Sequence, residues 1–299
     1  MTLIRKLLSL LPDKIFLDLQ YFKNFHRLPN WKSPKSFNEK IQWLKLYDRR
    51  PEYTSMVDKF AVKRIVAEKI GEEHIIPTLG VWDRPEDIEW ETLPQKFVLK
   101  TTHGGGNNGV IVCKNKNTID KASVIEKLSK GLKRDSFAYG REWPYRGVKR
   151  RIIAEEYITP SPNNKDLIDY KWYCFNGEPK YCQVIQDRST KETIDFFDTE
   201  WRHQEFIGLN PAAVPALVPP TRPNNLDLQI HIARELSQGM PFSRIDLYES
   251  GGNTYFGEIT LYPNSGLGFF SPERYNELLG QMIMLPSEKQ GWQFVISNS

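Results

Sequence analysis

A glycine-rich loop between two β-type runs constrains the fold of this chain more than any other stretch of its sequence. The segment Phe97–Cys113 reads FVLKTTHGGGNNGVIVC, and Lys100 ends the first run. The loop between the runs contains Gly104, Gly105, Gly106 and Gly109. Because a glycine has no Cβ, its backbone N–H can approach an anion closely. The segment therefore fits either a β-hairpin with a long turn or a cradle of N–H groups and one ammonium over a row of phosphates.

Three known phosphate-binding patterns match these glycines, and each fails in its context. The spacing of Gly104 and Gly109 matches the first part of a P-loop, but Val110 and Ile111 stand where Lys-Ser/Thr is required. The dinucleotide fingerprint must open a helix, whereas β-branched residues follow this loop. In protein kinases the lysine follows the loop, and neither H-R-D nor D-F-G occurs downstream here. What remains is a glycine loop between antiparallel strands whose lysine lies on the incoming strand.

The composition is that of a globular protein with one large or two ordinary domains. The chain has 299 residues, 39% of them hydrophobic and 26% charged, and a formal net charge of +4. So small and dispersed a basic excess does not indicate a nucleic-acid partner. No apolar run is long enough for a transmembrane helix. The odd number of cysteines and the lack of C-x-x-C spacing predict reduced core thiols in a cytoplasmic protein.

Helical and β-type segments divide the chain into three parts. The first part is helical: Ser36 and Glu39 form a predicted capping box, and residues 54–70 are predicted as one helix. The second part holds the glycine loop and ends in a basic, aromatic loop at 134–150, followed by a strand. The third part alternates strands with helices. We predict an α+β fold.

Two carboxylates near the C-terminus lie on strands that are otherwise apolar. Asp246 follows Arg244 in the run RIDLY, and Glu258 lies in the run FGEIT. A buried carboxylate without a partner is costly. Two such acids beside an arginine therefore indicate a metal site better than they indicate chance.

The chain as a whole resembles the ATP-grasp superfamily and, more narrowly, the TupA-like ATP-grasp family, which is named for a teichuronopeptide biosynthesis protein. The resemblance rests on SPKSFNEKIQWLKLYDRRPEY, VDKFAVKRIVAEKIGEEHIIPTLGV, LPQKFVLKTTHGGGNNG, IIAEEYI and RIDLY with FGEIT. It implies an ATP-grasp fold, in which two α+β subdomains enclose ATP. Here residues 1–75 would replace the usual pre-ATP domain, 76–158 would be the small subdomain, and 159–299 would carry the metal site.

The resemblance also implies roles for particular residues. Glu155 would read the adenine, Asp169 would bind the ribose, and Glu156, Tyr157 and Ile158 would supply backbone contacts. The phosphates would meet Lys59, Lys100 and the loop of Gly104, Gly105, Gly106 and Gly109. Lys171 would be a catalytic cation, and Arg244 would stabilise the charge that develops on the acyl-transfer intermediate. Asp246 and Glu258 would hold Mg²⁺, with Thr260 in the place of the usual asparagine and Asn264 as an alternative third ligand.

The activity that the resemblance implies is an ATP- and Mg²⁺-dependent carboxylate–amine ligase of bacterial surface polysaccharide (capsule) biosynthesis. Its partners would be ATP, an anionic saccharide containing uronic acid, and an amine or amino acid, with peripheral contact to a membrane-bound glycan assembly. A polysaccharide-modifying kinase or a glycosyltransferase-type enzyme using the same nucleotide site is the alternative. A non-catalytic nucleotide-binding scaffold is a third interpretation, to which the Thr260 departure points.

Overall fold

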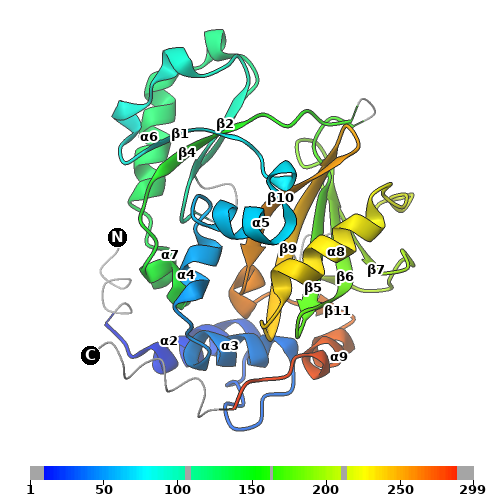
Figure 1. Cartoon of the computed structure of the whole chain (residues 1–299). Helices are drawn as coiled ribbons and strands as arrows, with labels where there is room; N and C mark the ends of the chain where they lie inside the picture. Colours follow the sequence, from blue (N-terminus) through cyan, green and yellow to red (C-terminus); the bar gives the residue numbers. More distant parts are fainter. Residues whose placement is uncertain (1–9, 105–108, 162–163, 210–213, 288–299) are drawn as a thin grey trace.

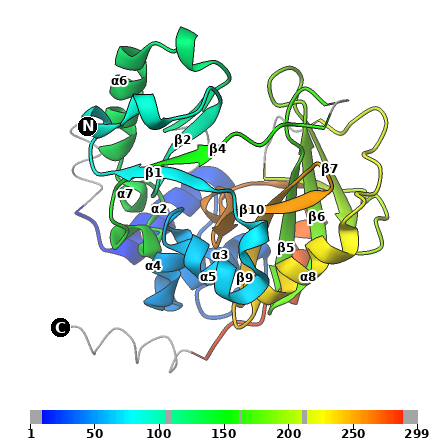
Figure 2. The same ribbon diagram turned by 45° about the horizontal axis from the view of Figure 1, so that its top comes forward.

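The computed structural model describes residues 10–104, 109–161, 164–209 and 214–287. Two antiparallel sheets lie on opposite sides of a cleft (Figures 1 and 2). The smaller has the order β1-β4-β2-β3, with bounds Thr78–Trp82, Ile152–Glu156, Phe97–Thr101 and Val110–Cys113. The larger has the order β10-β9-β5-β6-β7, with bounds Asn253–Thr260, Phe242–Ser250, Asp169–Phe175, Glu178–Gln186 and Thr193–Asp198. A third pair joins β8 (Ile207–Gly208) to β11 (Phe270–Ser271). The chain also contains helices, and their combination with antiparallel sheets confirms the predicted α+β class.

Alternation along β2 explains why Lys100 faces the cleft. Phe97, Leu99 and Thr101 are buried, and the first two pack in a core beneath α6 (Lys121–Leu132). Side chains on a strand alternate between its faces, so Val98 and Lys100 lie on the other face, where both line a cavity. Gly109, the last residue of the glycine loop, has φ +80, a backbone conformation that L side chains rarely adopt. Gly105 and Gly106 lie outside the described residues, whereas Gly104 and Gly109 lie within them.

The helices of the first part are α2 (Asp13–Phe25), α3 (Phe37–Tyr47), α4 (Glu52–Val57) and α5 (Val62–Ile70). Residues of α3, α4 and α5 belong to the core of the larger sheet, whereas α2 packs against α3. Phe37 of α3 contacts Phe242 of β9 edge to face, with 4.9 Å between ring centroids. The same core includes residues of α8 (Leu226–Ser237) and α9 (Arg274–Met282). The predicted capping box at Ser36 and Glu39 is confirmed.

The prediction of one continuous helix over 54–70 is wrong, because the chain breaks at Asp58. Asp58 is extended, with φ −77 and ψ 112, and ends α4. Its Oδ1 then accepts the backbone N–H groups of Phe60 at 2.9 Å and Ala61 at 3.2 Å. The N–H of Lys59 donates to the carbonyl of Thr102 at 3.0 Å, which ties this turn to the end of β2. The carboxylate of Asp58 thus holds a turn ahead of α5 and interrupts the predicted helix.

The segment 134–150, predicted as a loop, contains two short helices. They are α7 (Ser136–Gly140) and the 3₁₀ helix η5 (Trp143–Arg146), and α7 begins at Asp135, whose carboxylate accepts the N–H of Ala138. The three cysteines are buried and free, as predicted. Among the described residues, no helix combines the length and the apolar character needed to cross a membrane.

Candidate active site

A cleft of about 840 Å³ lies between the two sheets and is lined with cations. Its basic residues come from both sides: Lys59, Lys100, Arg134, Lys171, Arg188 and Arg244. A second cavity of about 400 Å³ runs along the segment that follows β4. The two cavities share Lys100 and Asp169 among their lining residues. A ligand with a flat apolar end and an anionic tail fits such a pair of spaces.

Strand pairing in the larger sheet brings the predicted catalytic and metal residues together. Asp246 on β9 lies opposite Lys171 on β5, and Glu258 and Thr260 on β10 lie opposite Asp246 and Arg244. Directly opposed residues share one face of a sheet. A β-bulge between Phe256 and Glu258 shifts the register by one residue and sets Glu258 beside Asp246.

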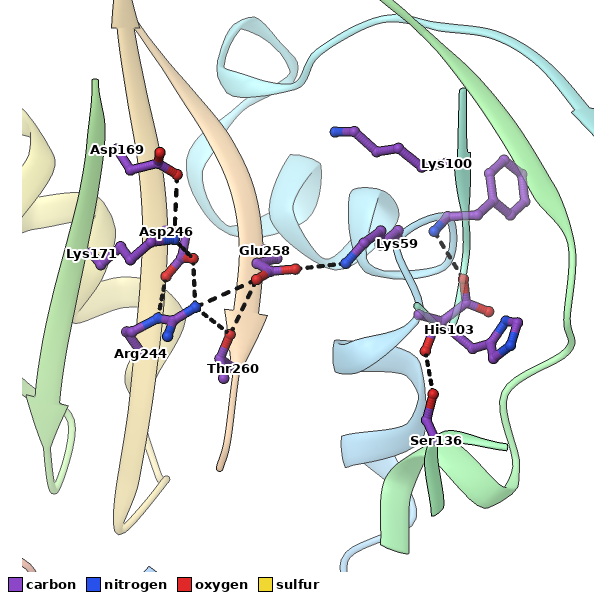
Figure 3. Close-up of polar contacts among 12 residues, drawn as sticks. Lys59, Lys100, His103, Ser136, Asp169, Lys171, Arg244, Asp246, Glu258 and Thr260 are labelled. Carbon is purple, nitrogen blue, oxygen red and sulfur yellow. Dashed lines mark hydrogen bonds and ion pairs between the residues drawn. The ribbon is translucent and has the colours of Figure 1, made fainter. Parts of the chain in front are cut away.

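These residues form one network of ion pairs (Figure 3). Arg244 donates to both oxygens of Asp246 at 2.6 and 2.7 Å, and to Thr260 Oγ1 at 3.1 Å. Lys171 Nζ contacts Asp246 Oδ2 and lies 3.3 Å from Asp169 Oδ1. Lys59 Nζ reaches from the turn after α4 to Glu258 Oε2 at 2.6 Å. The sequence predictions thus converge on one network, to which both sides of the cleft contribute.

Glu258 is held in its ionised form. Burial alone would raise its pKa, but the charges of Lys59, Lys171 and Arg244 outweigh burial and hold the pKa well below its usual range. The Glu258 side chain is 31% exposed, whereas that of Asp246 is 1% exposed and does not line the cleft. Glu258 therefore presents a charged oxygen to the cleft, with Asp246 behind it.

Glu155 on β4 is buried between two lysines. Lys100 Nζ lies 2.6 Å from Oε2, and Lys63 Nζ lies 2.6 Å from Oε1. Burial raises the pKa of this carboxyl, but the two ammonium groups lower it further, so the net shift is downward. Lys63 Nζ also donates to the carbonyl of Ile76 at 2.5 Å. Glu155 is thereby held in one position in the lining of the smaller cavity.

Sequence reasoning missed Lys63. The only available signal was its position four residues after Lys59, which places both on one face of a continuous helix. Because the chain turns between them, Lys59 reaches Glu258 in the cleft, whereas Lys63 reaches Glu155 from outside the two cavities described above. Arg188 also lies in the cleft, with Nε 2.8 Å from Asp169 Oδ2.

The small cavity has the character of an adenine pocket. Tyr157 and Ile158 line it together with Glu155, and Glu156 lines it from an exposed position. Apolar side chains of the smaller sheet and of the segments that precede β1 and β5 complete the walls: Ile76, Val98, Val112 and Leu167. An apolar slot with one fixed carboxylate and adjacent backbone suits a flat heterocycle with an amino group.

The oxygen ligands in the cleft suit a Mg²⁺ ion that is held by one carboxylate and completed by phosphate oxygens and water. Among the described residues, no group of three His, Cys, Asp or Glu side chains gathers to hold a metal. Mg²⁺ usually takes one or two carboxylates and completes its shell with phosphate oxygens and water. Glu258 offers such a ligand, and both oxygens of Asp246 already accept from Arg244. Asn264 lines the cleft, but its amide donates to the carbonyl of Leu209.

Two facing antiparallel sheets around a lysine-lined, nucleotide-sized cavity define the ATP-grasp class. The chain matches the family model TupA-like ATPgrasp over residues 39–284, and it belongs to the TupA-like ATP-grasp family. The predicted family and fold are therefore confirmed. A search of curated proteins finds no match to the chain.

Several solved ligase structures are similar to this chain at low sequence identity. The D-alanine–D-alanine ligase from Helicobacter pylori is 16% identical over 84% of this chain and 70% of its own, with a TM-score of 0.46. The corresponding ligase from Bacillus anthracis is 15% identical over 75% and 62%, with a TM-score of 0.42. The ATP-grasp ligase PsnB, complexed with minimal precursor, Mg and ADP, is 13% identical over 75% and 57%, with a TM-score of 0.39. The chain thus spans less than two thirds of the length of the Bacillus anthracis ligase.

Proposed function

We propose that this protein is a cytoplasmic, ATP- and Mg²⁺-dependent carboxylate–amine ligase. The observation that carries the proposal is the convergence of cations from both sides of the cleft next to the adenine-sized cavity. Lys59 and Lys100 come from one side, and Lys171 and Arg244 from the other. Nucleotide phosphates and an acyl-phosphate are both highly charged, so a ligase site must above all position and neutralise anions.

We assign each residue a role according to the part of the cleft that it lines. Glu155 and the backbone of residues 156–158 would hold the adenine, and Asp169 the ribose. Lys100 and the glycine loop, including Gly104 and Gly109, would bind the phosphates nearest the adenine. Lys59, Lys171 and Arg244 would neutralise the transferred phosphoryl group. The backbone that supports Lys59 and Lys100 is tied together by the Lys59–Thr102 hydrogen bond.

Mg²⁺ bound at this site would supply Lewis-acid charge to the phosphate oxygens. We propose that Glu258 would be its principal protein ligand, with Asp246 and Thr260 behind it. Arg244 would hold Asp246 and Thr260 in place through the hydrogen bonds described above.

The proposed carboxylate is a uronic acid of a bacterial surface polysaccharide. Two considerations support it: the cationic lining of the cleft, which suits an anionic sugar, and the resemblance of the chain to a family named for teichuronopeptide biosynthesis. The enzyme would then act on a growing glycan, in peripheral contact with a membrane-bound assembly.

A product assay tests the proposal. The protein is incubated with ATP, Mg²⁺, a glucuronic-acid oligosaccharide and a panel of amino acids and amines, and ADP, phosphate and amide are quantified. We expect ADP release that requires both the uronate and an amine. Lys171→Met should reduce it about 100-fold or more, because a preorganised charge in the transition state is lost. Lys130→Met, on the exposed face of α6, is the matched control. A phosphorylated sugar without amide would instead support the kinase alternative.

A further inference from the structure

One end of the large cleft is built from two segments that none of the roles above uses. One wall comes from the connection between α6 and β4, with Arg134, Tyr139 and Glu142 in the lining. The opposite wall follows β10 and includes Asn264 and Ser265 of the 3₁₀ turn η6 (Pro263–Gly266). Because Thr260 precedes η6 by only a few residues, this end adjoins the proposed site of phosphoryl transfer.

Tyr145 shows that this end of the cleft is near the ion-pair network of Arg244 and Glu258. Its hydroxyl pKa is raised well above the usual value, first by burial and then by the charges of Glu142 and Glu258, while Arg244 lowers it. Tyr145 therefore lies within electrostatic reach of Glu142 and of the Arg244–Glu258 network at once. A group bound at Glu142 would be a neighbour of the reacting phosphate.

Buried polar residues of α3 hold this end of the cleft rigid. Lys45 is fully buried, and its Nζ donates to Gly140 O at 2.8 Å, Ser265 O at 2.9 Å and Ser265 Oγ at 3.1 Å. Gln42 Nε2 donates to Ser265 O and Gly266 O at 3.0 and 2.9 Å. These bonds fix Asn264 and Ser265 at φ +49 and +55. Left-handed non-glycine residues are strained and cluster at ligand sites.

Glu142 differs from the other carboxylates of the cleft. Asp169, Glu192 and Glu258 each lie within 4.0 Å of a lysine or arginine nitrogen, whereas no such ion pair of Glu142 occurs among the described residues. Its hydrogen-bond partner is Ser265, and Lys45 acts on it only by charge. Burial raises the pKa of Glu142, which is the direction that suits a group accepting a proton near neutral pH.

Arg134 complements Glu142 at the same end. Its guanidinium lies over the ring of Tyr139, 4.7 Å from the centroid, and forms no ion pair with a carboxylate among the described residues. Ser136, two residues on, donates to the carbonyl of His103 at 3.0 Å and ties this wall to the start of the glycine loop (Figure 3). Arg134 also acts on Glu142 by charge, and both line this end of the cleft. An acid and a guanidinium in one lining, neither of them in an ion pair among the described residues, match a zwitterion.

We propose that this end of the cleft is the amine-acceptor subsite and that it takes an α-amino acid, with the ammonium on Glu142 and the carboxylate on Arg134. The proposal rests on the ligase function proposed above. The ammonium gives one proton to Glu142, and the resulting amine nitrogen bonds to the carbonyl carbon of the acyl-phosphate. The bond from that carbon to the phosphate oxygen breaks, and the electron pair leaves with inorganic phosphate. The phosphate takes the second proton lost by the nitrogen.

Ligand-observed NMR tests the subsite without knowledge of the glycan. The full chain, with Mg²⁺ and a non-hydrolysable ATP analogue, is titrated with each of the twenty common amino acids. We expect at least one to bind, and Glu142→Gln and Arg134→Met each to weaken it about 30-fold or more, as removal of one partner of a close charge pair does. The decarboxylated analogue of that amino acid should be indifferent to Arg134→Met. Glu89→Gln and Arg84→Met, both exposed, are the controls.

The outcomes separate the two proposals. If the ATP analogue does not bind the wild-type chain, the ligase function itself fails. If the analogue binds but no amino acid does, or if amino-acid binding survives both substitutions, the ligase function stands and the subsite is overturned. Thermal unfolding of each variant, together with its binding of the ATP analogue, shows that it is folded, and Glu142→Asp replaces Glu142→Gln if the latter is not.

Discussion

Glu155 shows how one residue serves both stability and binding. Its buried carboxylate neutralises Lys63 and Lys100, of which Lys100 lines the smaller cavity. The same carboxylate lines that cavity. A charge buried between two partners is costly to break on one side, because the remaining charges lose their compensation.

Glu155→Gln should therefore destabilise the protein in a pH-dependent way. The pKa of Glu155 is lowered in the folded state, so its stabilisation is fully present above the unfolded pKa of about 4.3 and is lost as the pH falls toward the folded pKa. We expect the variant to lose about 3 kcal/mol at pH 7, and this difference to shrink below about pH 4. Urea unfolding from pH 7 to pH 3 measures it. The exposed neighbour Glu156→Gln is the control, and a difference that stays constant with pH would contradict the account.

Substitution of Lys59 distinguishes a contact with phosphate from a purely structural role. Its ammonium bonds Glu258 across the cleft at 2.6 Å, but its proposed role is to meet phosphate. Lys59→Met should weaken ATP binding about tenfold or more and leave adenosine binding unchanged. Calorimetric titration of both ligands tests this, with Lys130→Met as control. Equal losses for ATP and adenosine would mean that Lys59 only supports the fold.

At the scale of elements, short connections carry much of the site, and sequence patterns predict them least well. The glycine loop, the strands and the capped helix at Ser36 follow from local chemistry and were predicted. The break at Asp58 was not, because the apolar spacing of Val57, Val62 and Val66 reads equally well through a turn. The short helices in residues 134–150 were missed for a related reason: a five-residue helix offers no periodicity to detect.

The contact between α7 and η6 gives an element-scale prediction. A Cβ on Gly140 would lie 2.2 Å from Ser265 Oγ and 3.3 Å from Ser265 Cβ. Gly140→Ala should therefore destabilise the protein by about 1–3 kcal/mol, as overpacking does. In a Ser265→Ala background the same substitution should cost less, because the nearest atom is gone. Urea unfolding of the wild type, the two single variants and the double variant measures the coupling free energy. If Gly140→Ala lowers the free energy of unfolding equally in both backgrounds, the predicted steric contact between α7 and η6 is contradicted.

At the scale of the whole molecule, two hydrophobic cores support one cleft. The core of the smaller sheet contains Phe97 and Ala154, and the larger core joins the helices of the first part to the larger sheet. Local patterns predicted strands, but none shows how the strands assemble into two sheets or that helices α3 to α5 pack on the C-terminal sheet. That packing explains how Lys59 reaches Glu258, 199 positions away in the chain. The division at residues 75 and 158 remains a proposal.

The central claim is that ATP activates a carboxylate in this cleft as an acyl-phosphate. In that reaction one carboxylate oxygen becomes the bridging oxygen and leaves with the phosphate when the amine attacks. The most direct measurement supplies a uronate labelled with ¹⁸O in its carboxyl group, together with ATP, Mg²⁺ and an amine, and records the mass of the released phosphate. The account predicts phosphate that carries one ¹⁸O atom for each amide formed. Unlabelled phosphate, or a phosphorylated sugar that retains both labelled carboxyl oxygens, would contradict it.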